Sequence, residues 1–239
     1  MGDTLRTSGL VAGLALLLSS LVPPALDAGE GFGLEDILAS PFPSSLTASP
    51  SGQRLAWVFT LRGVANVWVA EGPEFEARSL TGFEDDDGRP LSVVGVSPDG
   101  GWVYLAKSSD FNPDHRPLGR GASTLYRVAW SGGEPETLAE TASAVVSPVS
   151  DRLAWADGGA LWVLEPGQEP EKVVETRGVL ASPRWSHDGR RLLTSSLRGQ
   201  FPHRYGFVLL YDLEAETIRY VEPSISLDTG PVWSPDGTK

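Results

Sequence analysis

Cysteine is absent from this 239-residue sequence, which excludes disulfide bonds, thiolate catalysis and cysteine-based zinc sites. Basic residues are also few, because 19 Lys and Arg stand against 31 Asp and Glu, giving a net charge of −12. No cluster of Lys and Arg stands out, so the charge argues against a nucleic-acid partner, whose phosphates attract basic surfaces. With three histidines and no close grouping of His with carboxylates, the sequence indicates no metal site and no cofactor.

A hydrophobic run long enough to cross a bilayer is missing near the amino terminus. The apolar run at residues 10–22 has 13 residues, which as a helix rise about 20 Å against a bilayer core of roughly 30 Å. Arg6 precedes it as a positive charge, and small residues follow at Ala25 and Ala28. This order predicts a signal peptide at residues 1–28 and an exported protein, periplasmic or secreted, with no membrane association after cleavage. A buried first helix and an uncleaved anchor are the alternatives.

The sequence is rich in Gly (27), Pro (19) and Trp (8), which favour frequent turns and packed sheets. After residue 40 a short motif recurs, in which a serine is followed by a turn and an apolar strand. Its copies read ASPSGQRLAWV (48–58), VSPDGGWVYLA (96–106), VSPVSDRLAWA (146–156), WSHDGRRLLTS (185–195) and WSPDGTK (233–239). The aligned serines are 48, 50, 39 and 48 residues apart. A period of this length with short strands is typical of β-propeller blades.

The composition of the turn has a physical explanation. Pro presets φ at the first central turn position, Asp hydrogen-bonds the local backbone, and Gly takes the position with φ > 0. The copies SPVS and SHDG lack part of this set, so we expect looser turns or another turn type there. Apolar residues alternate after each turn, and two further strands follow, the last of them more polar. Each unit is therefore predicted to be a four-stranded meander with its first strand innermost and its last strand outermost.

The predicted fold class is all-β, a β-propeller of four-stranded blades. Residues 46–239 are expected to form a partial propeller, with about four complete blades and the start of a fifth at 231–239. Residues 29–45 are expected to form a lead-in segment with one short helix, in which Leu34 and Leu38 have helical spacing. An open arc of blades leaves two apolar faces exposed. We therefore interpret the chain as a fragment of a longer protein, and the rival interpretation is self-association of two arcs.

Several segments resemble the amino-terminal propeller of bacterial exported serine peptidases of the prolyl oligopeptidase family, in its dipeptidyl or acylaminoacyl peptidase branch. They are LEDILASPFPSSLTASPSGQRLAWV (34–58), NVWVAEGPEF (66–75) with ARSLT (77–81), EDDDGRPLSVVGVSPDG (84–100) and LLYDLEAETIRYVEPS (209–224) with PVWSPDG (231–237). The resemblance covers nearly all of residues 33–239. TolB-type propellers share the SPDG motif, and some of them have no catalytic domain. The lead-in segment and FEDDDGRPLS (83–92) favour the peptidases.

The resemblance implies a two-part enzyme in which the propeller covers a carboxy-terminal α/β-hydrolase domain. That domain carries a Ser nucleophile in a G-x-S-x-G motif, with Asp and His completing the triad. The chain contains no G-x-S-x-G, so we assign no catalytic residue and expect the chain alone to be inactive. The implied role of the propeller is to admit only short peptides, and its implied partners are the missing domain and a peptide substrate. The substrate-binding residues stay unassigned.

Two alternative functions remain open. The first is a periplasmic TolB-like binding propeller without enzymatic activity. The second is a propeller enzyme with a site on its axis, such as a lactonase or a lyase. Under either alternative no hydrolase domain is needed, so the coding sequence after Lys239 separates them from the peptidase hypothesis.

The acidic run Asp85–Asp87, flanked by Glu84 and Gly88, is a candidate cation site or amine-binding rim. Calcium-binding loops place their carboxylates on alternate residues, and this run does not. A solvated acidic loop is therefore the favoured interpretation.

Two polar loops and one histidine are further candidates. Residues 107–123 and residues 197–206 are interpreted as exposed surface loops, with a substrate contact as the alternative. His187 replaces Pro in a turn and is expected to make a local turn contact. The candidate side chains are Asp110, Asp114, His115, Arg116 and Arg120 in the first loop and Arg198, His203, Arg204 and Tyr205 in the second.

Overall fold

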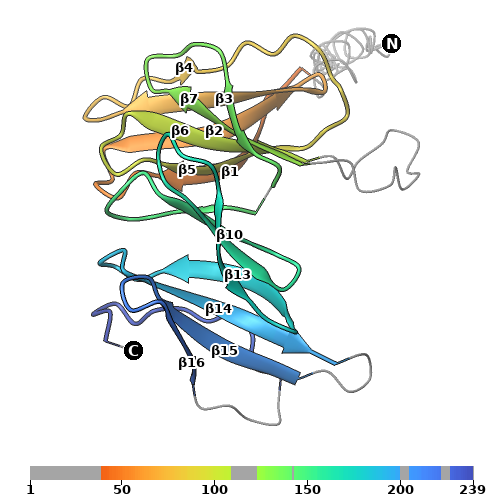
Figure 1. Ribbon diagram of the computed structural model, residues 1–239. Helices are drawn as coiled ribbons and strands as arrows, with labels where there is room; N and C mark the ends of the chain where they lie inside the picture. The colour runs from red at the N-terminus through yellow and green to blue at the C-terminus, as the bar shows by residue number, and fades with distance from the viewer. Residues whose placement is uncertain (1–38, 109–122, 142, 200–204, 222–226, 239) are drawn as a thin grey trace, which may run out of the picture. The chain divides into compact units, whose positions relative to one another are not determined.

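The computed structural model describes residues 39–108, 123–141, 143–199, 205–221 and 227–238. These residues form β-strands, turns and irregular connections, and they contain no helix (Figure 1). Within these ranges, accordingly, no helix has the length and apolar character required to cross a membrane. The predicted signal peptide at residues 1–28 and the predicted short helix of the lead-in segment lie outside the described residues.

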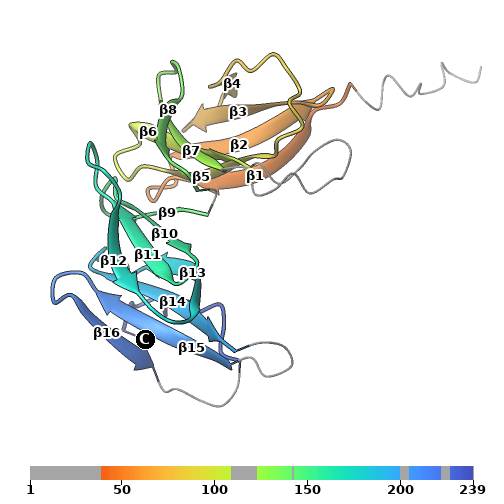
Figure 2. The same cartoon turned by 45° about the vertical axis from the view of Figure 1, so that its right-hand side comes forward.

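The strands form four antiparallel sheets, each built from four consecutive strands. Sheet 1 contains β1 (Phe42–Ala48), β2 (Arg54–Leu61), β3 (Val64–Glu71) and β4 (Arg78–Ser79), and sheet 2 contains β5 (Leu91–Val96), β6 (Trp102–Lys107), β7 (Thr124–Ala129) and β8 (Glu136–Ala139). Sheet 3 contains β9 (Val145–Val146), β10 (Leu153–Asp157), β11 (Ala160–Leu164) and β12 (Glu171–Glu175), and sheet 4 contains β13 (Val179–Trp185), β14 (Arg191–Arg198), β15 (Tyr205–Asp212) and β16 (Thr217–Val221). Figure 2 shows β9 to β12 side by side in chain order. The predicted four-stranded meanders are confirmed.

The first sheet begins earlier than the sequence indicated. β1 starts at Phe42, inside the range 29–45 assigned to the lead-in segment, and it pairs with β2 from Phe42↔Thr60 to Ala48↔Leu55. The extended, proline-containing end of the lead-in segment is therefore the first, edge strand of sheet 1. In sheets 2, 3 and 4 the last strand is the most exposed, as the rise in polarity predicted, whereas in sheet 1 β1 is also exposed at six of its seven residues.

The recurring serine organises the turn between the first two strands of each sheet. In sheet 2 the amide of Ser97 donates to the carbonyl of Trp102 at 2.9 Å, and its hydroxyl accepts from the Trp102 amide at 2.9 Å. The Ser97 hydroxyl also donates to Asp99 at 2.6 Å, and Gly100 closes the turn on the Ser97 carbonyl with φ +76°. Because these bonds satisfy it, the serine can be fully buried, with 0% of its surface exposed.

The two atypical turns behave differently from each other. In the SHDG copy, Gly189 still donates to the Ser186 carbonyl and the Ser186 hydroxyl still donates to Asp188, so the expectation of a looser turn is wrong there. Pro is dispensable because the Asp and Gly supply the required contacts. In the SPVS copy, hydroxyls replace the missing Asp, and Ser150 lies 3.2 Å from Ser147 through their side-chain oxygens.

Three clusters of buried side chains form the core, and each joins two consecutive sheets. The first packs Ala56 and Val58 of sheet 1 against Val103 and Leu105 of sheet 2. The second joins sheets 2 and 3, and the third joins sheets 3 and 4. Among the described residues no cluster joins sheet 1 to sheet 4, so the four sheets form an open series. This is the predicted all-β propeller arrangement with an incomplete ring.

The fifth copy of the motif lies against sheet 4. The amide of Gly230 donates to the Ser195 hydroxyl at 3.0 Å, and the indole of Trp233 donates to the Arg184 carbonyl at 3.3 Å. Gly237 closes the fifth turn on the Ser234 carbonyl at 2.8 Å. The predicted start of a fifth blade therefore occupies the position that follows sheet 4 in the series.

Candidate functional site

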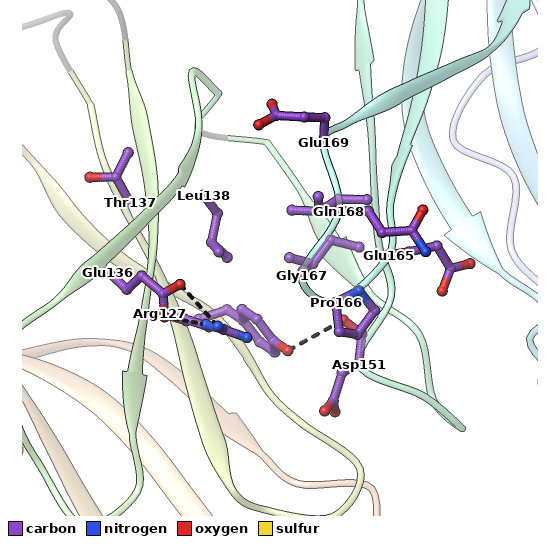
Figure 3. Close-up of a pocket in the computed structure, with 13 residues that line it drawn as sticks. Arg127, Glu136, Thr137, Leu138, Asp151, Glu165, Pro166, Gly167, Gln168 and Glu169 are labelled. Atoms are coloured by element: carbon purple, nitrogen blue, oxygen red, sulfur yellow. Dashed lines mark hydrogen bonds and ion pairs between the residues drawn. The ribbon is translucent and has the colours of Figure 1, made fainter.

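A cavity of about 230 Å³ lies between sheets 2 and 3 (Figure 3). One wall comes from β6, β7 and β8, and the other comes from the turn before β10 and from the β11–β12 turn at residues 165–169. Leucine side chains, among them Leu138 and Leu153, give it apolar surface, while the rest of the lining is mostly polar. Because it combines apolar surface with hydrogen-bonding groups, we treat it as the candidate site.

Arg127 is held firmly in one wall of the cavity. It faces Glu136 across the β7–β8 pair, with Nε donating to Oε2 at 2.7 Å and Nη2 donating to Oε1 at 3.0 Å. Its guanidinium also lies over the ring of Trp102, 4.2 Å from the ring centre. The hydrogen bonds from Arg127 hold the pKa of Glu136 below its usual value. The pair is thus a fixed, charge-compensated hydrogen-bonding element rather than a free cation.

Tyr104 links the two walls. Its side chain is almost fully buried, and its hydroxyl donates to the backbone carbonyl of Asp151 at 3.3 Å. Burial raises the pKa of Tyr104 far above that of free tyrosine, so the phenol stays protonated and acts as a donor. Burial and then repulsion from Asp99 raise the pKa of the Asp151 carboxyl, and Arg127 opposes the shift. In Figure 3 the carboxylate of Asp151 points away from the gap between Leu138 and Gly167.

The lining of this cavity offers hydrogen-bonding groups and carboxylates beside apolar surface. The lining residues that the structure describes include no serine, cysteine, histidine or lysine. Among all described residues, no group of three or more His, Asp and Glu is gathered closely enough to hold a metal ion.

The acidic run Asp85–Asp87 is tied into the connection between sheets 1 and 2. Asp86 accepts the Gly88 amide at 2.9 Å, and Asp87 forms an ion pair with Lys107 at 2.5 Å. Partial burial raises the pKa of Asp87, but the hydrogen bonds from Lys107 and the Arg89 amide outweigh it, so the pKa is lowered. The carboxylates therefore serve separate local contacts and do not converge on one point.

Of the remaining candidates, the structure describes His187, Arg198 and Tyr205. His187 lies against the backbone of the fifth turn, because a Cβ added at Gly237 would lie 3.2 Å from its Nδ1. Arg198 and Tyr205 face each other across β14 and β15, and Arg198 donates to the Tyr220 hydroxyl at 2.6 Å. The other named candidates, Asp110, Asp114, His115, Arg116, Arg120, His203 and Arg204, lie outside the described residues.

Sequence reasoning missed Arg54, Arg152 and Tyr104, which connect neighbouring sheets, and Arg127, which lines the cavity. The sequence held a signal for Arg54 and Arg152, because an arginine stands five residues after the turn serine in three copies of the motif. Arg127 and Tyr104 have no such signal, since they lie in the copy that departs from this pattern.

No protein-family model matches the chain, and no curated protein sequence matches it. Solved structures do resemble it. TolB from Acinetobacter baumannii has a TM-score of 0.55 and 17% identity, over 82% of this chain and 47% of TolB. A prolyl endopeptidase has a TM-score of 0.59 and 18% identity, over 78% of this chain and 30% of the endopeptidase. A puromycin-hydrolyzing peptidase from Mycobacterium tuberculosis has a TM-score of 0.53 and 17% identity, over 80% of this chain and 30% of the peptidase.

These likenesses define the class of the protein at the level of its fold. The four meanders and their neighbours among solved structures make this chain a β-propeller of the kind seen in TolB and in the propeller-bearing peptidases. The chain spans between 30% and 47% of the length of these three proteins. At 17–18% identity these likenesses show the fold alone and not an activity.

Proposed function

We propose that this chain is the substrate-gating propeller portion of an exported serine peptidase that acts on short peptides. Its catalytic α/β-hydrolase domain, with the G-x-S-x-G nucleophile, lies outside these 239 residues. The chain by itself is inactive and serves as a lid that excludes folded proteins from the nucleophile. Export follows from the signal peptide proposed at residues 1–28.

The observation that carries the proposal is the connection between sheets 1 and 2. Residues 83–92 supply the segment that favoured the peptidases over TolB-type propellers in sequence, and they form an anchored link between two blades. Asp87 pairs with Lys107, and Arg89 donates to the carbonyls of Lys107 and Ser108 at 3.2 and 3.1 Å. The resemblance to the peptidases therefore rests on residues that link sheet 1 to sheet 2. The fold-level likeness to two peptidases supports the same proposal.

A TolB-like binding propeller without enzymatic activity is the second candidate. The cavity between sheets 2 and 3 favours it, because its described lining offers hydrogen-bonding groups and apolar surface to a bound partner. The likeness to TolB covers 82% of this chain. Under this proposal the cavity and the polar turns beside it contact a protein or peptide partner.

The coding sequence that follows Lys239 and the activity of its product test the two proposals. The complete reading frame should encode further blades and then a hydrolase domain with G-x-S-x-G. Its periplasmic or secreted product should cleave aminoacyl or dipeptidyl p-nitroanilides. Matched controls are the Ser→Ala variant of that motif and the 239-residue chain alone, both of which should be inactive. A frame that stops after blade closure, with a product that binds but does not cleave peptides, would favour the TolB-like function instead.

A variant lacking residues 1–28 tests export separately. It should remain in the cytoplasm, whereas the full frame should appear outside it. Equal distribution of both proteins would contradict the proposed signal peptide without bearing on the peptidase activity.

A further inference from the structure

One end of sheet 4 extends past its neighbour in the series. The face of sheet 4 that packs against sheet 3 carries Leu192 and Leu209 in their shared core cluster. β14 and β15 have eight residues each, whereas β10 and β11 have five. The amide of Leu180, which pairs with Ser196 of β14, donates to the Gly158 carbonyl in the β10–β11 turn at 2.7 Å. The end of the same face beyond Ser196 therefore lies past this turn.

This end of the face carries an arginine and aromatic rings, and we call Arg198, Tyr205, Phe207 and Tyr220 the Arg198 surface. Arg198 pairs with Tyr205, and Leu209 pairs with Tyr220. Because side chains alternate between the two faces of a sheet, the register places these residues and Phe207 on the face of Leu209. The rings of Phe207 and Tyr220 meet edge to face, with their centres 6.1 Å apart.

The guanidinium of Arg198 is held in place by these rings. It lies 5.7 Å from the ring centre of Phe207 and 5.4 Å from that of Tyr220, and its Nη2 donates to the Tyr220 hydroxyl at 2.6 Å. A guanidinium carries further N–H donors that this bond does not use. Arg198 is exposed and Tyr205 is 42% exposed, so a ligand in solution can reach these donors.

The positive charge of Arg198 has no carboxylate partner among the described residues. At the other end of the same strand pair, Arg191 forms an ion pair at 3.2 Å with Asp212, the residue directly across from it. The residue directly across from Arg198 is Tyr205. Three further arginines form an ion pair with a glutamate of their own sheet: Arg54, Arg127 and Arg152. The charge of Arg198 is thus left uncompensated where an ion pair could have formed.

We infer that the Arg198 surface binds the carboxy-terminal carboxylate of a short peptide, with the apolar side chain of the last residue against Phe207 and Tyr220. A guanidinium binds a carboxylate through two parallel hydrogen bonds, and the rings beside it supply apolar contact area. The inference rests on the proposed function, because it takes its ligand from the short peptides on which the protein is proposed to act. A terminal carboxylate is common to all such peptides, whereas an acidic side chain is not.

The position of the Arg198 surface argues against another blade as its occupant. This face of sheet 4 already packs on sheet 3 through Leu192 and Leu209. The fifth copy of the motif contacts the opposite face, where the Gly230 amide donates to the Ser195 hydroxyl at 3.0 Å. A small ligand fits the strip that remains beyond the β10–β11 turn.

Peptide titration of the product of the complete reading frame tests the inference. The probes are N-acetyl-Ala-Phe with a free carboxylate and the same peptide as its carboxamide, and isothermal titration calorimetry measures their binding. Where the frame encodes a G-x-S-x-G serine, alanine replaces it so that the peptides stay intact. The free acid should bind about tenfold more tightly than the amide, because only the acid offers a charged acceptor to the guanidinium.

Two arginine variants separate a specific contact from general charge. Arg198→Gln should reduce the affinity for the free acid to that for the amide, and Arg198→Lys should restore part of the difference. The matched control is Arg219→Gln, because Arg219 is exposed beside Tyr220 on β16 and points to the opposite face of the sheet. It should leave both affinities unchanged. Equal unfolding midpoints of the two glutamine variants show that a loss of binding is not a loss of fold.

Three outcomes would each overturn the inference: no measurable binding of the free acid, equal affinities for acid and amide, or an equal loss from Arg198→Gln and Arg219→Gln. Binding of N-acetyl-Glu-Phe-amide as tight as that of the free acid would also overturn it, since a side-chain carboxylate would then be the ligand. Failure of the proposed function gives a different result. The p-nitroanilides would then not be cleaved, while the preference for the free acid would persist.

Discussion

Replacing Arg152 by alanine should destabilise the junction between sheets 3 and 4. The substitution removes the bond from Nη2 to the Gly189 carbonyl at 2.6 Å, the ion pair with Glu165 at 3.7 Å and the guanidinium over the ring of Trp185 at 5.1 Å. It also leaves the Gly189 carbonyl without its charged donor. The side chain of Arg152 is 22% exposed, so water replaces only part of what is lost.

The expected loss is about 2 kcal/mol in the free energy of unfolding. A hydrogen bond from a charged donor contributes roughly 1.5–3 kcal/mol when buried, and partial exposure favours the lower end. A solvent-exposed ion pair adds about 0.2–1 kcal/mol, and a cation–π contact at an exposed site adds about 0.5–1 kcal/mol. These contributions overlap because one guanidinium makes them all, so their sum is an upper bound. A loss of this size lowers the melting temperature by about 4–8 °C in a domain of roughly 200 residues.

Urea unfolding followed by tryptophan fluorescence measures the loss, and Arg190 supplies the matched control. Arg190 is exposed and directly follows Gly189 in the turn of sheet 4, so Arg190→Ala should change the free energy of unfolding by less than about 0.5 kcal/mol. Arg152→Lys keeps the charge but not the planar fork, and it should fall between wild type and Arg152→Ala. Equal effects of Arg152→Ala and Arg190→Ala would refute the assignment of a stabilising contact between Arg152 and the Gly189 carbonyl.

Three further predictions concern the core and the turns. Leu192→Ala, at a fully buried position between sheets 3 and 4, should cost about 2–5 kcal/mol in thermal unfolding, and a cost below about 1 kcal/mol would show that the site is not packed as described. The hydrogen bond from Ser186 lowers the pKa of Asp188, so the ionised Asp188 carboxylate contributes to stability above pH 4, and this contribution is lost as pH falls through the lowered pKa. The difference in melting temperature between wild type and Asp188→Asn should therefore shrink from pH 5 to pH 2.5. A constant difference would contradict this. Val149→Asp should restore the missing Asp contact to Ser147 and raise stability by about 0.5–1 kcal/mol in urea unfolding, and a loss of stability would show that hydroxyls already serve that turn best.

The repeat made the sheets predictable from sequence. All four meanders were predictable from the recurring serine, the alternation of apolar residues after it and the polar last strand of each unit. Turn composition and the two-residue period of side chains along a strand depend only on neighbouring residues, so the sequence shows them directly. The residues between the sheets were not predictable in the same way. Arg152 reads as an ordinary polar strand residue, and only the register of sheet 3 on sheet 4 brings its guanidinium to the Gly189 carbonyl. The looser turn expected at Ser186 does not form, because Asp188 and Gly189 close the turn without a proline.

Among the junctions between the four described sheets, the candidate cavity lies at the one where the motif lacks both its arginine and its glycine. Between sheets 2 and 3 the arginine of the motif is Trp102, and the turn glycine is Ser150. Between sheets 3 and 4, the Arg152 guanidinium donates to the Gly189 carbonyl at 2.6 Å. Between sheets 2 and 3, the described residues have instead the hydrogen bond from the Tyr104 hydroxyl to the Asp151 carbonyl at 3.3 Å. Arg127 lies over Trp102 within its own sheet and turns to Glu136, so it does not bridge the gap. The cavity of about 230 Å³ lies at this junction, where Trp102 and Ser150 stand in place of the arginine and glycine of the motif, and departures from a structural repeat are where function is expected to reside.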